Sequence, residues 1–216
     1  MNLAHQITAV NRTVTLDPSR QAITLEQIYP TSAEELWWTC TRPERLARWF
    51  EPVDGNLVVG GRYRLTSSGT VGTIERCDSP QLLVLTWEYG GDISYVTLTI
   101  AEAPGGARLT IRHSAALDDH WATYGPASGG MGWDESLLAL ALLTSGRDAD
   151  PEALQRLLGS DEGRDFLATS ARAWRDEHVA AGADSGEAEA SARRAYSAYL
   201  DQPQELPSSN LSEESR

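Results

Sequence analysis

The chain has 216 residues and a formal net charge of −13, and its 41% hydrophobic content is sufficient to bury a core. An acidic protein repels phosphate backbones, so we expect neither nucleic acid nor an anionic membrane as a partner. All 18 cationic residues are arginine, and the absence of lysine excludes Schiff-base catalysis and lysine-based phosphate sites.

The first part of the chain predicts an N-terminal strand or arm over residues 1–20. Residues 1–10 lack a basic stretch followed by an apolar run, so we expect no signal peptide and a cytoplasmic protein. Val10–Leu16 and Ala22–Tyr29 are strand-like runs, and residues 17–20 between them are typical of a turn.

Two short helices are predicted next. Thr31 and Ser32, followed by two glutamates, form a capping signal for a helix that continues to about Cys40. Pro43 is a favourable first helical residue and predicts a second helix to about Phe50.

A series of strands follows, separated by short polar or glycine-containing breaks. Such breaks are typical of hairpins, so the series predicts an antiparallel meander. The predicted strands are Arg62–Ser67, Val71–Cys77, Leu82–Tyr89, Ile93–Ala101 and Ala107–Ser114.

The strongest helical pattern covers Gly129–Ser145, after a polar segment, Leu117–Ser128, that we expect to be a loop. The helix is apolar over a wide arc, which predicts burial against the sheet. Its longest apolar stretch, Leu137–Leu143, is too short to span a bilayer.

The segment after Gly146 predicts a helical extension and then disorder. The three expected helices are Pro151–Leu158, Asp161–Ala181 and Glu187–Leu200. The sequence therefore divides into an N-terminal arm, a main domain, a helical extension and a disordered tail, over residues 1–20, 21–145, 146–200 and 201–216.

This order of elements predicts an α+β fold, in which a curved antiparallel sheet is covered on its apolar face by the long helix. A narrow helix does not fill the whole concavity of a curved sheet. We therefore expect an apolar cavity between them, the kind of cleft that ligands favour.

Residues Ala22–Ser145 resemble bacterial proteins named for their likeness to the C-terminal domain of the activator of the heat-shock-protein-ninety ATPase. That family belongs to the START-like (SRPBCC, helix-grip) superfamily, and the resemblance implies the helix-grip fold. The matching pieces are Leu36-Trp37, residues 43–50, residues 59–63, the strand of Gly72, residues 79–83, Thr86-Trp87-Glu88, residues 105–113, Gly132-Trp133 and Leu137.

The expected cavity residues combine large rings with one imidazole. His113 shares its strand face with Leu109 and Ile111, so it is expected on the covered side, either as a cavity group or as a satisfied core histidine. The full candidate lining is Trp49, Tyr63, Trp87, Tyr95, His113, Trp133 and Leu137.

Other motifs have simpler interpretations. Residues 129–132 lack the phosphate-loop pattern and suggest a hinge or lid, and residues 117–121 suggest a solvated loop rather than a metal site. Cys40 and Cys77 are expected to be buried free thiols, and Trp38 to lie under the arm or the extension or to contact a partner. We expect no metal and no cofactor.

Three functions remain open from the sequence. The first is binding of an apolar or aromatic small molecule, with no assignable reaction. The second is a chaperone-activator-like interaction, although the N-terminal module of such activators does not fit in about twenty residues. The third is a cavity enzyme, such as a cyclase or hydrolase, in which His113 acts with Tyr63 or Tyr95.

The extension is too sparsely apolar to fold alone, so we expect it to pack on the main domain or on a second subunit, or to cap the cavity mouth. A homodimer is the oligomer we would expect first.

Overall fold

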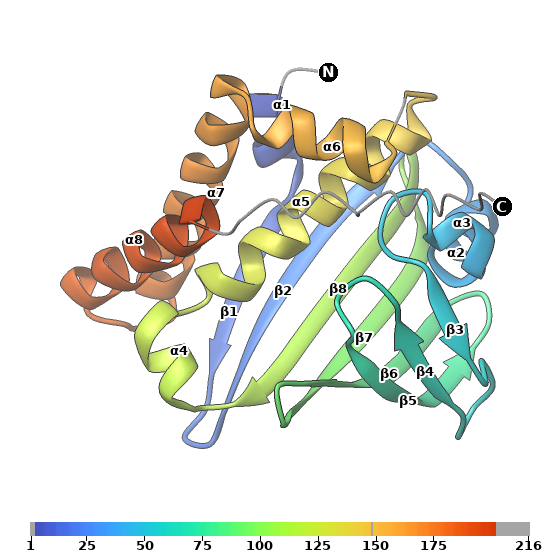
Figure 1. Cartoon of the computed structure of the whole chain (residues 1–216), viewed down its shortest axis with the longest axis horizontal. Helices are drawn as coiled ribbons and strands as arrows, with labels where there is room; N and C mark the ends of the chain where they lie inside the picture. The colour runs from blue at the N-terminus through green and yellow to red at the C-terminus, as the bar shows by residue number, and fades with distance from the viewer. Residues whose placement is uncertain (1–2, 148, 202–216) are drawn as a thin grey trace, which may run out of the picture.

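The structure is a computed structural model that describes residues 3–147 and 149–201. Eight strands form one antiparallel sheet in the order β1-β2-β8-β7-β6-β5-β4-β3 (Figure 1). The strands are β1 Asn11–Leu16, β2 Arg20–Tyr29, β3 Val53–Gly55, β4 Arg62–Leu65, β5 Val71–Asp78, β6 Leu82–Tyr89, β7 Asp92–Ala103 and β8 Gly106–Ala116.

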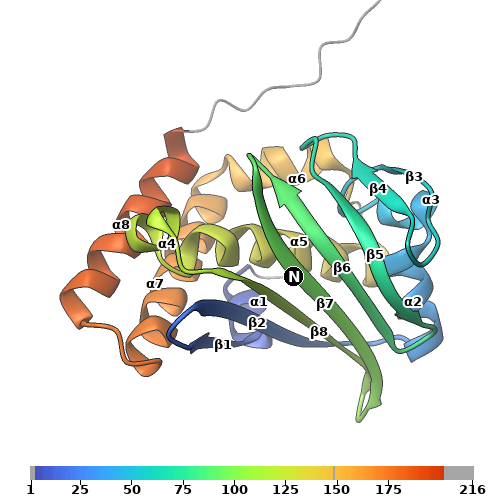
Figure 2. The ribbon, with the colours of Figure 1, turned by 90° about the horizontal axis from the view of Figure 1, so that it is seen from below.

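The helices lie at both ends of the sheet and along its concave face (Figures 1 and 2). They are α1 Leu3–Ala9, α2 Ala33–Thr41, α3 Pro43–Leu46, α4 Asp119–Tyr124, α5 Ala127–Thr144, α6 Pro151–Leu158, α7 Asp161–Ala180 and α8 Ser185–Asp201. The expected α+β helix-grip architecture is confirmed.

The meander runs from β3 to β8, and the N-terminal hairpin then joins its last strand. β2 pairs with β8 along its whole length, with Leu25 opposite Ile111 and Ile23 opposite His113. In Figure 1, β1, β2 and β8 pass behind α5, while β3 to β6 curve away from α7 and α8. This curvature leaves room at one end of the sheet.

Helix α5 is buried on nearly all sides, as its sequence predicts. Its residues from Leu137 to Leu142 are all buried, because β2 lies on one side of the helix and α7 and α8 lie on the other. A helix that is apolar all round requires such enclosure. The extension thus packs on the main domain of the same chain.

Several helices begin where a short polar side chain accepts a backbone N–H, which satisfies one of the unpaired donors of the first turn. Ser32 accepts from Glu35 at 3.2 Å, as the capping signal predicts. The other caps of this kind are Asp118 of α4, Asp150 of α6 and Ser160 of α7.

Four local predictions need correction. The helix that begins at Pro43 ends at Leu46 rather than near Phe50, because Trp49 turns back and donates its indole N–H to the Thr39 carbonyl at 3.0 Å. The expected loop before α5 contains helix α4, which Gly125 ends with φ of 59°.

The other two corrections are elements that the sequence did not reveal. Helix α1 precedes the N-terminal strand, and its residues Leu3 and Ile7 are buried where α1 meets α7. Strand β3 has only three residues, too few for alternation to be visible. The tail predicted to be disordered, 202–216, lies outside the described residues.

Candidate ligand-binding pocket

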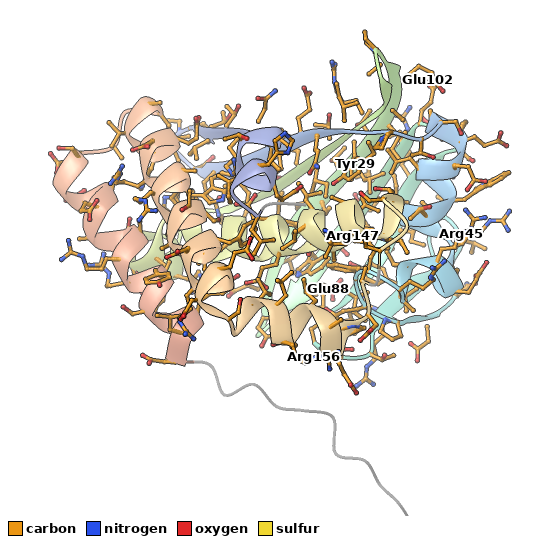
Figure 3. The ribbon with its side chains drawn as sticks, turned by 90° about the horizontal axis from the view of Figure 1, so that it is seen from above. Tyr29, Arg45, Glu88, Glu102, Arg147 and Arg156 are labelled. Carbon is orange, nitrogen blue, oxygen red and sulfur yellow. The ribbon has the colours of Figure 1, made fainter. Side chains whose placement is uncertain are left out.

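A pocket of about 420 Å³ lies where the sheet curves away from α5. Its lining comes from the segment 40–50, strands β3 to β8, the loop between β3 and β4, and Trp133 of α5, and it includes no charged side chain. The volume is within the range of small-molecule sites, about 300–1,000 Å³. Figure 3 shows Arg45 at this α2–α3 end of the molecule, opposite α7 and α8.

Aromatic rings form one wall of the pocket. Phe50 and Trp133 are parallel, with an interplanar angle of 2° and centroids 5.9 Å apart. Trp87 is tilted against both, with its centroid 6.2 Å from Phe50 and 5.8 Å from Trp133. These are offset-stacked and tilted geometries that aromatic pairs prefer. The wall therefore offers ring faces and edges rather than charges.

The hydroxyl of Tyr63 is already paired within the protein. It donates to the Thr86 carbonyl oxygen at 2.7 Å, and burial raises the pKa of this phenol. Its ring crosses Gly72 on the neighbouring strand, where a Cβ would lie 2.6 Å from the ring. Glycine is required there because a Cβ would also lie 2.0 Å from the Thr86 carbonyl oxygen, the backbone atom that accepts the Tyr63 hydrogen bond.

The structure brings four of the seven expected residues to the pocket: Trp49, Tyr63, Trp87 and Trp133. Tyr95 does not line the pocket, because it alternates with the inward-facing Val96, and the Arg20 guanidinium lies 5.3 Å from its ring centre.

Leu137 and His113 are also outside the lining. Leu137 lies one turn beyond Trp133 and is buried in the core, where its carbonyl accepts from the Tyr29 hydroxyl at 3.3 Å. Figure 3 shows Tyr29 beside α5.

His113 lies directly behind the aromatic wall. Its Nδ1 accepts the indole N–H of Trp133 at 3.1 Å, and its Nε2 lies 2.8 Å from the Ser94 hydroxyl. Burial lowers the pKa of His113 to about 4, so the imidazole is neutral at pH 7. Neither Tyr63 nor Tyr95 contacts it, and this arrangement does not support an acid–base role toward a ligand in the pocket.

The sequence did not identify the rim of the pocket. Leu57, Val58 and Val59 line it and are 38%, 56% and 58% exposed, although all three are apolar. Three consecutive apolar residues before Gly60-Gly61, in a loop, are the signal that could have found them. Cys77 also lines the pocket and is exposed, whereas Cys40 is buried as expected.

Gly130 and Gly132 lie within the first turns of α5 and allow close packing, rather than forming a hinge or lid. A Cβ at Gly130 would lie 2.2 Å from the Trp174 indole, and one at Gly132 would lie 2.8 Å from the Tyr199 hydroxyl. These glycines allow α7 and α8 to approach α5. No described residue beyond Trp133 lines the pocket, so the idea that the extension caps its mouth is wrong.

Two remaining motifs have structural roles. Asp118 caps α4, and His120 lies 3.0 Å from the Ser128 hydroxyl. The ring of Trp38 is partly buried, and the guanidinium groups of Arg42 and Arg45 lie 4.8 and 5.8 Å from its centre. The Trp38 ring therefore makes cation–π contacts with both arginines.

Within residues 3–147 and 149–201, no group of three or more His, Cys, Asp or Glu side chains is arranged to hold a metal ion. In the same part of the chain, no helix combines the length and apolar character needed to cross a bilayer.

Comparison with known structures extends the likeness beyond the main domain. CalU16 of Micromonospora echinospora is 28% identical in its crystal structure, with a TM-score of 0.62 over 78% of this chain and 98% of CalU16. Its solution structure gives 26% identity and a TM-score of 0.68 over 81% and 97%. Residues outside the main domain therefore share in this likeness.

More distant structures share the fold alone. EF2215 of Enterococcus faecalis, a conserved protein of unknown function, is 18% identical, with a TM-score of 0.59 over 82% of this chain and 96% of its own. DynU16, a protein in the dynemicin biosynthetic locus, is 19% identical, with a TM-score of 0.50 over 60% and 49%. No curated protein matches the sequence.

The family model described as activator of Hsp90 ATPase homolog 1-like protein matches residues 30–144, which is more than half of the chain. This range includes every strand of the meander, α5 and all of the pocket lining. The chain therefore belongs to the family of activator of Hsp90 ATPase homolog 1-like proteins.

Proposed function

We propose that this protein binds a neutral, apolar or aromatic small molecule in the pocket between β3–β8 and α5. The observation that carries the proposal is a pocket of about 420 Å³ with no charged lining residue. Burying a charged ligand group in such a site without a partner would be costly, so the ligand should be uncharged where it is enclosed.

The polar groups around the pocket support this assignment. Tyr63 donates to Thr86, Trp49 donates to Thr39 and Trp133 donates to His113, so these three donors are already used within the protein. A ligand would gain little from them as hydrogen-bond partners. Its affinity would come from apolar burial, at about 25 cal/mol per Å², and from ring stacking.

The apolar rim supports it further. Leu57, Val58 and Val59 expose apolar surface beside the pocket opening. A bound molecule that reaches the rim would cover part of this surface and remove it from water. The ligand would then be stabilised along its length and not only at its buried end.

The proposal is tested by titration with N-phenyl-1-naphthylamine, a neutral fluorescent probe. Saturable, one-to-one binding is expected. Leu98→Trp fills the pocket and should weaken the affinity about tenfold or more, because overpacking costs about 1–3 kcal/mol.

Thr97→Trp is the matched control, since it adds the same ring to the opposite face of β7 and should bind as the unaltered protein does. Absence of saturable binding, or equal affinity in the two variants, would refute the proposed function.

The family match raises a second candidate, stimulation of an Hsp90-type ATPase. Here the expected observation is faster ATP hydrolysis by the chaperone when the protein is added. An unchanged rate together with failure to co-purify would remove this candidate, and neither result would affect the small-molecule assignment.

A further inference from the structure

The hydrogen bonds behind the aromatic wall determine the protonation of His113. The indole N–H of Trp133 can only donate, so the His113 Nδ1 at 3.1 Å must be an unprotonated acceptor. The Ser94 hydroxyl donates its one hydrogen to the Trp87 carbonyl at 3.1 Å. It must then accept at its 2.8 Å contact with Nε2. The single form that satisfies every contact is the neutral imidazole with its proton on Nε2.

This imidazole joins three elements of the pocket wall. From β8, His113 reaches Trp133 of α5 and Ser94 of β7, and through Ser94 it is linked to the backbone of β6 at Trp87. The indole of Trp133 is confined between Phe50, which is parallel to it, and His113, which meets it edge-on at 85° with centroids 6.0 Å apart. A change at His113 would therefore first alter the position of the Trp133 ring, which lines the pocket.

We propose that His113 is a positioning residue for ligand binding, which as a neutral acceptor holds the Trp133 indole in the orientation that forms the pocket wall. This proposal rests on the proposed function. His113 lines no part of the pocket and acts through Trp133. It replaces the role that the sequence suggested, in which His113 would meet the ligand itself.

Protonation would break the arrangement, because a proton on Nδ1 would face the Trp133 N–H donor to donor. Among residues 3–147 and 149–201, the groups that face the ring from the packed elements are neither titratable nor charged: β2 presents Ile23, β7 presents Ser94 and Val96, β6 presents Trp87 and α5 presents Trp133. Burial keeps the imidazole neutral at physiological pH.

The first test uses the ligand-free protein. In ¹⁵N-labelled protein at pH 7, the ring shifts of His113 should identify Nε2 as the protonated nitrogen. The Trp133 indole signal, assigned with Trp133→Phe among the seven tryptophans, should be protected from exchange. Finding the proton on Nδ1, or an imidazolium, would overturn the proposal without the need for any His113 variant.

The second test compares two substitutions. His113→Asn keeps an acceptor near the Nδ1 position, whereas His113→Leu removes it. In His113→Leu, exchange of the Trp133 indole should be about tenfold faster and N-phenyl-1-naphthylamine affinity about fivefold to tenfold weaker, as expected for one lost hydrogen bond. His113→Asn should stay within about twofold of the unaltered protein on both measures.

The outcomes separate the two proposals. Absence of probe binding by the unaltered protein removes the proposed function, and with it any ligand role of His113. If the probe binds, equal affinities in His113→Leu and His113→Asn, with an unchanged Trp133 signal, overturn the positioning role alone. If His113→Leu does not fold, the ring shifts of the unaltered protein and the affinity of His113→Asn still decide.

Discussion

Trp133 and Asp134 are consecutive residues of α5, but they face opposite surroundings. Trp133 faces a pocket lined by apolar side chains, with no charge among them. Asp134 is 1% exposed and faces β1 and the extension, where it accepts from Arg12 of β1 at 2.7 Å and from Ser170 and Trp174 of α7 at 2.6 and 3.0 Å. One side of the helix retains space, and on the other side both carboxylate oxygens of Asp134 are paired.

The difference shows how this helix can both stabilise the fold and serve a binding site. A buried carboxylate is tolerated only when its partners are fixed, so β1 and α7 are held against α5 through Asp134. The pocket side has no such requirement, and its rings can leave a cavity. We therefore expect substitutions on the Asp134 side to change stability most, and substitutions on the Trp133 side to change binding as well as stability.

Loss of the buried carboxylate should have the largest effect. Asp134→Ala leaves the Arg12 guanidinium, whose side chain is 5% exposed, without its counter-charge, and it leaves Ser170 and Trp174 without their acceptor. The free energy of unfolding, measured by urea denaturation, should fall by about 3–5 kcal/mol.

Two controls accompany Asp134→Ala. The double variant Arg12→Leu with Asp134→Leu removes both charges and should lose less stability than Asp134→Ala. Glu152→Ala breaks the exposed pair with Arg156 and should cost less than about 1 kcal/mol. Equal losses in all three variants would contradict the contrast between buried and exposed charges.

On the pocket side, stability should depend on His113 at acid pH. The pKa of His113 is lowered to about 4 from an ordinary 6.5, so between these values the unfolded chain binds more protons. Its contribution is complete above pH 6.5 and is lost as the pH falls toward 4, by about 3 kcal/mol. The stability difference between the unaltered protein and His113→Leu should shrink by that amount from pH 7 to pH 4. A constant difference would mean that His113 titrates normally.

On the extension side, Glu135 should give the opposite dependence on pH. Burial, and then the charge of Asp134, raise the pKa of Glu135 to about 8 from an ordinary 4.5. The folded protein therefore holds a proton that the unfolded chain has released, and stability falls as the pH rises through this range. Between pH 6 and pH 9 the unaltered protein should lose about 3 kcal/mol through this group, and Glu135→Gln should avoid that loss, as followed by thermal or urea unfolding. Parallel pH curves for the two proteins would contradict the assignment.

The smallest expected effect concerns the packing of α7 on α5. Gly130→Ala places a Cβ against the Trp174 indole and should cost about 1–2 kcal/mol through overpacking, as measured by urea denaturation. Gly129→Ala, one residue earlier, meets its nearest atom at 3.5 Å and should be neutral or stabilise by up to about 1 kcal/mol. Similar results for the two alanines would show that Trp174 does not fix the distance between the helices.

Much of the fold could be predicted because the spacing of apolar residues over short stretches of sequence determines its elements. Alternation over the meander strands and the apolar arc of Gly129–Ser145 identified the sheet and α5, since side chains repeat every two residues in a strand and every 3.6 in a helix. Helix α1 and strand β3 were missed because each is too short for such a repeat to be clear.

The site was only partly predictable. Parity placed His113 on the covered face of β8, and this is confirmed by its hydrogen bond to Trp133 of α5. The alternation of side chains along β8 could not tell whether His113 lines the pocket or lies behind its wall. The same limit applies to the rim, because Leu57 and Val58 belong to a loop whose path depends on the neighbouring strands.

The sequence by itself determined the order, type and covered faces of the main elements, because periodicity and turn residues act over a few neighbours. Only the tertiary structure decided where space remains around α5, and that the glycines at its start receive Trp174 and Tyr199. These features arise from contacts between residues far apart in the chain, and packing at near-crystalline density makes each depend on the exact shape of its neighbours.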